Sequence, residues 1–94
     1  MERIVSVVPK DGLHARPASQ FVETANSFDA EITLGRVDDD SLVPAASMLA
    51  VTGLGVSHGE EIRLVADGDD AEAALDALED VLSTPESGDE ASEN

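Results

Sequence analysis

The 94-residue chain contains no cysteine, tryptophan or tyrosine, and its only aromatic residues are Phe21 and Phe28. Without cysteine, a disulfide framework and a thiolate metal site are both excluded, and the composition fits a reducing compartment. No apolar run approaches the roughly 20 residues that span a bilayer, and the first residues lack the features of a signal peptide. We therefore expect a cytoplasmic protein that does not insert into membranes, with a core of Val, Leu, Ile and Ala.

Basic residues are also scarce. Five Lys and Arg face 21 Asp and Glu, which gives a formal net charge of −16, and Lys10 is the only lysine. This excess argues against binding to nucleic acid or to an anionic membrane surface. Because the acids are spread along the chain, we expect a protein from a salt-accumulating halophile, in which high salt screens the self-repulsion. The alternative is an acidic mesophilic protein with a negative interaction face.

The length fits one small domain, for which the apolar pattern runs over residues 1–82. Residues 83–94 carry four acids, no base and no apolar pattern. A segment of that composition cannot bury enough apolar surface to offset the entropy of ordering. We expect a disordered acidic tail there.

Apolar periodicity predicts seven elements of secondary structure. Alternation predicts strands at residues 3–8, 31–36, 41–43 and 60–66. Helical spacing predicts helices at residues 16–27, 45–52 and 69–82. Pro44 confines the third strand to an edge, and Asp69 with Glu72 resembles a capping box for the last helix. The order of the elements predicts an α+β open-faced sandwich, in which three helices lie on one face of a mainly antiparallel four-stranded sheet.

The residues with the clearest chemistry lie at 12–18, Gly-Leu-His-Ala-Arg-Pro-Ala. Pro17 suits the first turn of a helix, so His14 should lie just before a helix N-terminus, where unpaired N–H groups and the dipole favour an anion. Imidazole is a nucleophile near neutral pH, and the forked guanidinium of Arg16 suits phosphate oxygens. The pattern predicts that His14 accepts a phosphoryl group, stabilised by Arg16 and by the backbone of Ala15 and Arg16. The alternatives are an exposed loop histidine and a surface arginine in a salt bridge.

The second histidine, His58, has no neighbour at the spacing of a metal site. The acidic run at 38–40 lacks the ligand spacing and glycine of a calcium loop. We interpret both as solvated turns, and we expect neither a metal nor a cofactor.

Residues 12–18 resemble the phosphorylation-site motif of HPr, the histidine-containing phosphocarrier family of the sugar phosphotransferase system. A second similarity lies at 46–49, 54–56 and 59–62, where Ala-Ser-Met-Leu, Leu-Gly-Val and Gly-Glu-Glu-Ile resemble the family's second helix, its regulatory-serine region and its fourth strand. The resemblance covers about residues 2–82, and the predicted order of strands and helices is also that of the family. The tail has no counterpart.

The resemblance implies a carrier protein rather than an enzyme. His14 would be phosphorylated on Nδ1 by enzyme I, at the expense of phosphoenolpyruvate, and would pass the group to a IIA protein. Arg16 would be the active-site arginine, and a carrier that docks on successive partners is expected to be a monomer. The implied docking face beside His14 consists of Ala15, Ser19, Met48, Leu49, Ala50, Thr52 and Gly53.

Ser47 matches the serine that a kinase phosphorylates in some branches of the family, which makes it a possible regulatory site. The alternative is that it caps a short helix. The chain departs from the family where lysines often lie on the first helix, because Glu23 and Asn26 occupy that region. A partner selected for a basic face should bind poorly, so either the partners are co-adapted or an apolar patch at Met48, Leu49 and Val51 drives contact.

Three functions remain open at the level of sequence. The first is a phosphoryl carrier serving a sugar, dihydroxyacetone or nitrogen-linked branch. The second is a regulatory HPr-like protein whose phosphorylation state controls a partner, with transport secondary. The third is a small binding domain in which the motif is accidental, and an unreactive His14 would favour it.

Overall fold

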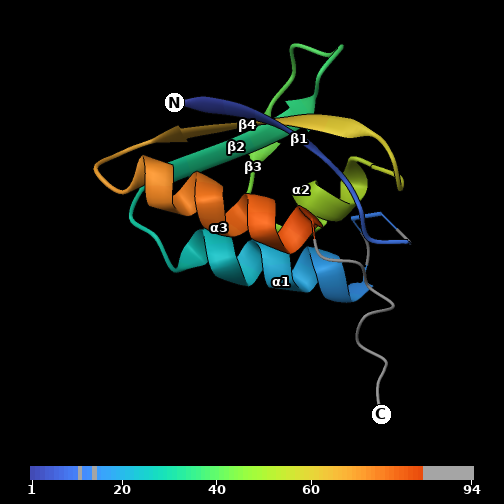
Figure 1. Ribbon diagram of the computed structural model, residues 1–94, viewed down its shortest axis with the longest axis horizontal. Coiled ribbons are helices and arrows are strands. Elements are labelled where there is room, and N and C mark those ends of the chain that lie inside the picture. Colours follow the sequence, from blue (N-terminus) through green and yellow to red (C-terminus); the bar gives the residue numbers. More distant parts are fainter. Residues whose placement is uncertain (11, 14, 84–94) are drawn as a thin grey trace.

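The computed structural model describes residues 1–10, 12–13 and 15–83 (Figure 1). His14 and residues 84–94 of the predicted tail lie outside the described residues, whereas Ser83, predicted as the first residue of the tail, belongs to the last helix. The elements follow the predicted order: β1 (Glu2–Ser6), α1 (Ala15–Asn26), β2 (Glu31–Arg36), β3 (Val43–Pro44), α2 (Met48–Gly53), β4 (Glu61–Asp67) and α3 (Ala71–Ser83). None of the described helices is both long enough and apolar enough to cross a membrane.

The four strands form one sheet in the order β1-β4-β2-β3, and every neighbouring pair is antiparallel. In Figure 1, α1 and α3 lie side by side across one face of the sheet, and α2 lies at one end of that layer. Among the described residues, no helix lies on the other face of the sheet. The predicted α+β open-faced sandwich is confirmed, with a sheet that is antiparallel throughout.

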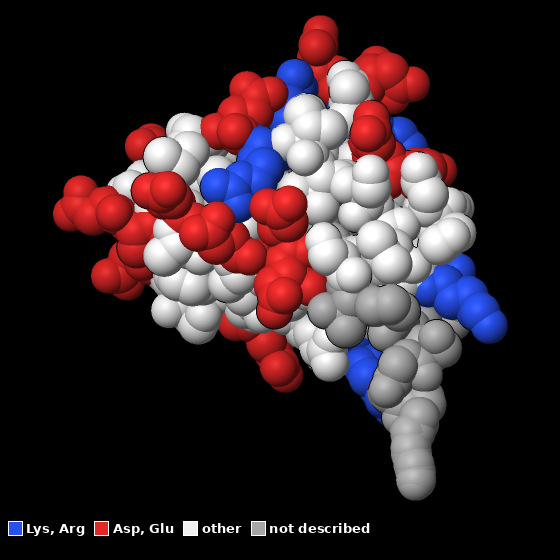
Figure 2. Space-filling model, in the orientation of Figure 1, with Lys and Arg blue, Asp and Glu red and all other residues white. Residues whose placement is uncertain are grey.

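The surface of the described part of the chain holds all of its charged side chains, since none of the buried side chains is polar or charged. Figure 2 shows acidic side chains over the left and upper parts of the molecule. The part of the same view that lies over α2 is mostly uncharged, with scattered basic side chains beside it. The acids are therefore numerous but not evenly distributed over this view.

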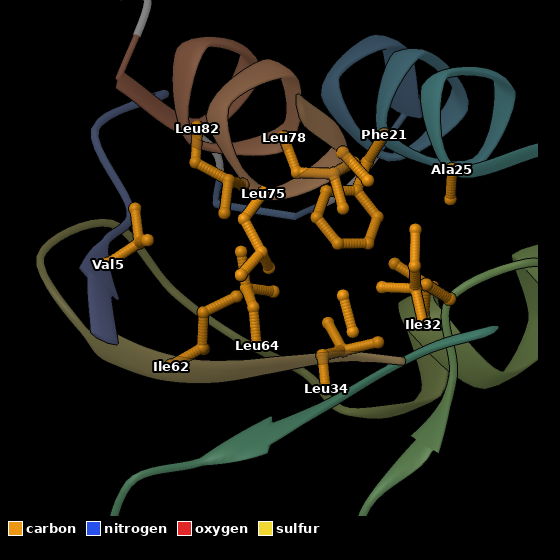
Figure 3. Packing of buried hydrophobic residues seen from close by; sticks show 14 of the residues in the cluster. Val5, Phe21, Ala25, Ile32, Leu34, Ile62, Leu64, Leu75, Leu78 and Leu82 are labelled. Atoms are coloured by element: carbon orange, nitrogen blue, oxygen red, sulfur yellow. The ribbon is translucent and has the colours of Figure 1, made fainter. Parts of the chain in front are cut away.

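The core is wholly apolar and lies between the helices and the sheet. Figure 3 shows Phe21 of α1 and Leu78 of α3 pointing toward the strands. Val22, Phe28 and Val81, also expected inside, are only partly buried against this core. The buried hydrophobic residues are Val5, Val7, Leu13, Ala18, Phe21, Ala25, Ala30, Ile32, Leu34, Ala45, Val51, Val56, Ile62, Leu64, Ala66, Ala71, Ala74, Leu75, Leu78 and Leu82.

The edge strand β1 is tied to α3 by an ion-pair cluster. Nη1 of Arg3 lies 2.6 Å from Oδ1 of Asp76 and 2.9 Å from Oε1 of Glu79. The hydrogen bond to Asp76 raises the pKa of the Arg3 guanidinium. Two of the acids expected on the solvent side of the last helix thus also contact the sheet.

Several element ends differ from the predictions for reasons that involve distant partners. β1 ends at Ser6, two residues earlier than predicted. Beyond this strand, the N–H of Val7 donates to the carbonyl of Glu60 and the N–H of Val8 donates to the carbonyl of Leu82, each at 2.9 Å. α2 begins three residues later than expected, at Met48. The N–H of Ala45 donates to the carbonyl of Ile32 at 2.9 Å and so continues the sheet. Pro44 itself belongs to β3, which is the edge strand predicted.

The start of α3 is the clearest difference. The helix begins at Ala71, not at Asp69, so a capping box of Asp69 and Glu72 does not describe its first turn. The residue directly before the helix is Asp70, and its carboxylate accepts hydrogen bonds from the N–H groups of Asp29 and Ala30, both at 2.9 Å. Asp70 therefore joins the start of α3 to the chain entering β2.

We predict that Asp70→Ala lowers the free energy of unfolding by about 2 kcal/mol, because two hydrogen bonds to a charged acceptor are lost and a partly buried N–H is left without its partner. The measurement is urea unfolding at a fixed KCl concentration. Asp69→Ala is the matched control, since it removes the same charge from an exposed neighbour. Equal unfolding midpoints for the two variants would contradict the prediction.

Candidate functional site

The predicted motif lies where α1 begins. The helix starts at Ala15, and its first turn contains Arg16, which is exposed, and Pro17, which is buried. The first N–H groups of a helix have no partner within it and point outward from its N-terminal end. The expected helix start beside the motif is thus confirmed, whereas the predicted phosphoryl acceptor, His14, lies outside the described residues.

The chain just before His14 is anchored in the core. Leu13 is fully buried, and its N–H donates to the carbonyl of Val56 at 3.1 Å. The N–H of Gly12 donates to the carbonyl of Pro9 at 2.9 Å, which closes the turn that leaves β1. Since α1 begins at Ala15, residue 14 is flanked on one side by a buried anchor and on the other by a helix.

Gly12 is required at this turn for two separate reasons. Its φ is +73°, a region that residues with a side chain seldom adopt. In addition, a Cβ on Gly12 would lie 2.2 Å from the carbonyl oxygen of Val56 and 2.8 Å from Cα of Ser57. The backbone at residues 12–13, which we call the site loop, is therefore in direct contact with the backbone of Val56 and Ser57, which follows α2.

A second contact joins the residues that precede the site loop, 7–8, to residues 58–59. The N–H of Gly59 donates to the carbonyl of Val7 at 2.8 Å. Nδ1 of His58 lies 2.8 Å from the carbonyl oxygen of Val8, so the tautomer protonated at Nδ1 donates to it. The ring is exposed, as expected for a loop histidine, but it also holds the chain that leads to the motif. Nothing in the local sequence of His58 indicates this contact.

Arg36, at the end of β2, holds the turn that follows α2. Its Nη1 donates to the carbonyl of Leu54 at 2.6 Å and its Nη2 to the carbonyl of Gly55 at 2.9 Å. Its Nε donates to Oε1 of Glu60 at 3.0 Å. The guanidinium thus fixes the two residues immediately before Val56. Sequence reasoning missed Arg36, because its partners are distant in the chain and two of them are backbone carbonyls.

The residues of the implied docking face lie on two packed helices, α1 and α2. Leu49 is 83% exposed and Met48 40% exposed, which is unusual for large apolar side chains. Val51 is fully buried, so its expected place in the apolar patch is wrong. In a helix, two residues apart means nearly opposite faces, and Val51 faces the core. Of the remaining positions, Gly53 is exposed, Ser19, Ala50 and Thr52 are half-buried, and only the backbone of Ala15 is described.

Ser47 is the N-cap of α2. Its backbone is extended, with φ −104° and ψ 112°, and its Oγ accepts a hydrogen bond from the N–H of Ala50 at 3.2 Å. The capping alternative is therefore confirmed. Regulatory phosphorylation of Ser47 stays a prediction.

The best-defined hollow of the described residues lies away from the predicted site. This shallow hollow of about 570 Å³ lies at the end of the sheet and is lined in part by Arg36, Asp38 and Glu60, with none of the predicted site residues. Within the described residues, no three His, Asp or Glu side chains are grouped so that they could hold a metal ion. The geometry at α1 is that of an exposed helix start beside a second helix with exposed apolar side chains.

Comparison with known proteins assigns this chain to the class of histidine phosphocarriers. The family model described as "PTS HPr component phosphorylation site" matches residues 1–84, and the chain therefore belongs to the HPr family of phosphocarrier proteins of the phosphotransferase system. Its members carry a phosphoryl group on histidine and are not enzymes themselves.

Individual relatives agree with this assignment. The chain is 80% identical over 86 residues to the phosphocarrier protein HPr of Haloferax volcanii, covering 92% of this chain and 97% of the relative. It is 53% identical over 77 residues to HPr of Streptomyces coelicolor, covering 82% of each. The crystal structure of HPr from Bacillus anthracis superposes with a TM-score of 0.82 at 38% identity, covering 87% of this chain and 95% of the other. The Haloferax relative fits the expectation of a halophilic source.

We predict that Gly12→Ala destabilises the protein by about 3 kcal/mol, because it adds a steric clash with the Val56 carbonyl to the cost of a positive φ. Gly55→Ala is the control. Its φ is +66°, but a Cβ there would meet nothing within 4 Å, so it should cost only about 1 kcal/mol. Denaturant unfolding of both variants measures the difference, and equal losses would refute the steric contact.

Proposed function

We propose that this phosphocarrier accepts a phosphoryl group on Nδ1 of His14 from phospho-enzyme I and passes it to a IIA protein. It would act in the cytoplasm as a monomer, and the IIA protein would belong to a sugar or dihydroxyacetone branch. The observation that carries the proposal is the position of the motif. The histidine follows a fully buried anchor, Leu13, and directly precedes α1.

The proposed transfer needs no co-reactant beyond the two proteins. The lone pair of Nδ1 attacks phosphorus, the bond between phosphorus and the donor's leaving atom breaks, and the donor keeps that electron pair. In the second transfer a nucleophile of the IIA protein attacks phosphorus, the bond between phosphorus and Nδ1 breaks, and Nδ1 regains its lone pair. A phosphoramidate retains a high transfer potential, so the carrier has to hold the group and not activate it further.

The start of α1 offers what a phosphoryl group requires. Unpaired N–H groups at a helix N-terminus bind anionic oxygens, and we assign this role to the backbone of Ala15 and Arg16. The Arg16 side chain is exposed in the first turn, where a cation is disfavoured by the helix dipole alone. A bound anion compensates for that cost, which favours a role for Arg16 in stabilising the transferred group.

The partners would dock on the surface formed by α1 and α2. Leu49 and Met48 supply exposed apolar area, and Ser19, Ala50, Thr52 and Gly53 surround them. Partly exposed apolar side chains next to a reactive group suit brief contacts with several proteins. A small molecule would instead require an enclosed pocket.

The decisive test is phosphotransfer in molar KCl from labelled phosphoenolpyruvate and enzyme I of the source organism. The wild type and His58→Ala should become labelled, with a bond that is acid-labile and alkali-stable, whereas His14→Ala should not. Label on all three proteins would place the acceptor elsewhere. Label on none of them, from an enzyme I that phosphorylates itself, would leave a regulatory or binding protein with a silent motif.

We further predict that Arg16→Ala slows transfer to His14 by about tenfold to a hundredfold, which corresponds to the loss of one charge-assisted interaction. The fold should be unchanged, because the side chain is exposed. Arg16→Lys keeps the charge but not the forked geometry, so its transfer rate should lie between those of the wild type and Arg16→Ala. Rapid-quench kinetics gives the rates, and a wild-type rate for Arg16→Ala would exclude the assigned role.

A further inference from the structure

Two stretches of this very acidic chain contain no acidic residue. Although 21 of the 94 residues are Asp or Glu, none occurs at 12–22 or at 41–59. Burial does not explain the gap, because both stretches include exposed positions. These include Arg16, Gln20, Ala46, Met48, Leu49 and Ser57.

The fold brings the two acid-free stretches together. The first contains the start of α1 and the second contains α2, and these helices pack against each other. The backbones of Leu13 and Val56 are hydrogen bonded, which joins the stretches again at the site loop. Figure 2 shows a mostly uncharged area over α2. Along the chain the gaps end at Glu23, Asp40, Glu60 and Asp11, the last of which lies outside the described residues.

Within the two acid-free stretches, the only Lys, Arg, Asp or Glu is the cation Arg16. Lys10, the only lysine of the chain, is exposed in the turn that precedes Gly12. On the acid-free face that the two stretches form, Leu49 exposes 83% of its surface. The face therefore lacks the negative charge of the rest of the chain and carries Leu49, the most exposed of the large apolar side chains among the described residues.

This distribution discriminates between two kinds of partner. A basic protein would gain most by meeting carboxylates, which crowd the other faces and are missing here. An acidic protein would be repelled everywhere except at a face without carboxylates, where an apolar contact can form. Salt separates the two cases, because it shortens the range of charge interactions from about 8 Å at 0.15 M to about 3 Å at 1 M and leaves apolar contact intact.

We infer that the acid-free face, with Leu49 as its apolar anchor, is built for a partner protein that is itself acidic, and that rising salt strengthens the complex. The inference rests on the proposed function, since it assigns the chemistry of the enzyme I surface that would dock there. In this complex, attraction between opposite charges is not the source of the affinity. The repulsion between two acidic proteins is screened, and the apolar contact supplies the binding energy.

The test is calorimetric titration of the unphosphorylated protein with enzyme I of the source organism, at about 0.2 M and about 3 M KCl. Sucrose is added at low salt to keep both proteins folded, and circular dichroism checks that they are. We compare the wild type with Leu49→Lys and Leu49→Glu, which remove the same apolar side chain and differ only in charge. Because Leu49 is mostly exposed, neither variant should disturb the fold.

The wild type should bind more tightly at high salt, where both variants should be weaker by about tenfold and equal to each other. At low salt Leu49→Lys should bind about tenfold more tightly than Leu49→Glu. The control pair, Ile4→Lys and Ile4→Glu, changes an exposed position of β1 in the same way, and its two members should differ much less.

Three results would overturn the inference, each in a different way. If the wild type weakens with salt and Leu49→Glu binds more tightly than Leu49→Lys, the partner surface is basic. If Lys and Glu at position 49 bind alike at low salt, charge plays no part. A second copy of this chain is also acidic, so sedimentation of the protein alone showing a dimer that Leu49→Glu dissolves would assign the face to self-association. Absence of any binding to enzyme I would instead refute the proposed function.

Discussion

The contact between two backbone segments, residues 12–13 and residues 56–57, is the constraint on which the site depends. The N–H of Leu13 donates to the carbonyl of Val56, and Gly12 approaches that carbonyl so closely that a Cβ has no room. Both Leu13 and Val56 are fully buried, so the contact belongs to the core and is not a surface loop interaction. It determines where the chain leaves the core before α1 begins at Ala15.

The core of the described residues is apolar, and the charged residues lie outside it. No polar or charged side chain is buried among the described residues, so the stability of the interior derives from apolar packing and backbone hydrogen bonds. The acidic surface can then vary with little cost to the fold. That freedom makes the acid-free face informative, because nothing in the packing prevents carboxylates at its exposed positions.

The fold was predictable from sequence because its determinants are local and periodic. Alternation identified the inward pair of β2, Ile32 and Leu34, and helical spacing identified the buried face of α3. The errors arose where a distant partner decides the outcome. The carboxylate of Asp70 is bound to the chain entering β2, and the N–H of Ala45 belongs to the sheet, so neither helix starts where its own sequence indicates. Val51 was misplaced because a run of apolar residues does not distinguish the two faces of a short helix.

At the candidate site, the motif was visible in the sequence and its supports were not. Gly12, Arg16 and Pro17 form a continuous pattern, whereas Arg36 holds Leu54 and Gly55 through contacts with no local signal. Those two residues lie between α2 and Val56, so Arg36 connects the end of α2 to the carbonyl that holds Leu13 in the site loop. A partner that contacts Leu49 is therefore positioned relative to the start of α1 through one continuous set of backbone contacts. Such preorganisation lowers the entropic cost of aligning donor and acceptor, and a carrier with few catalytic side chains depends on it.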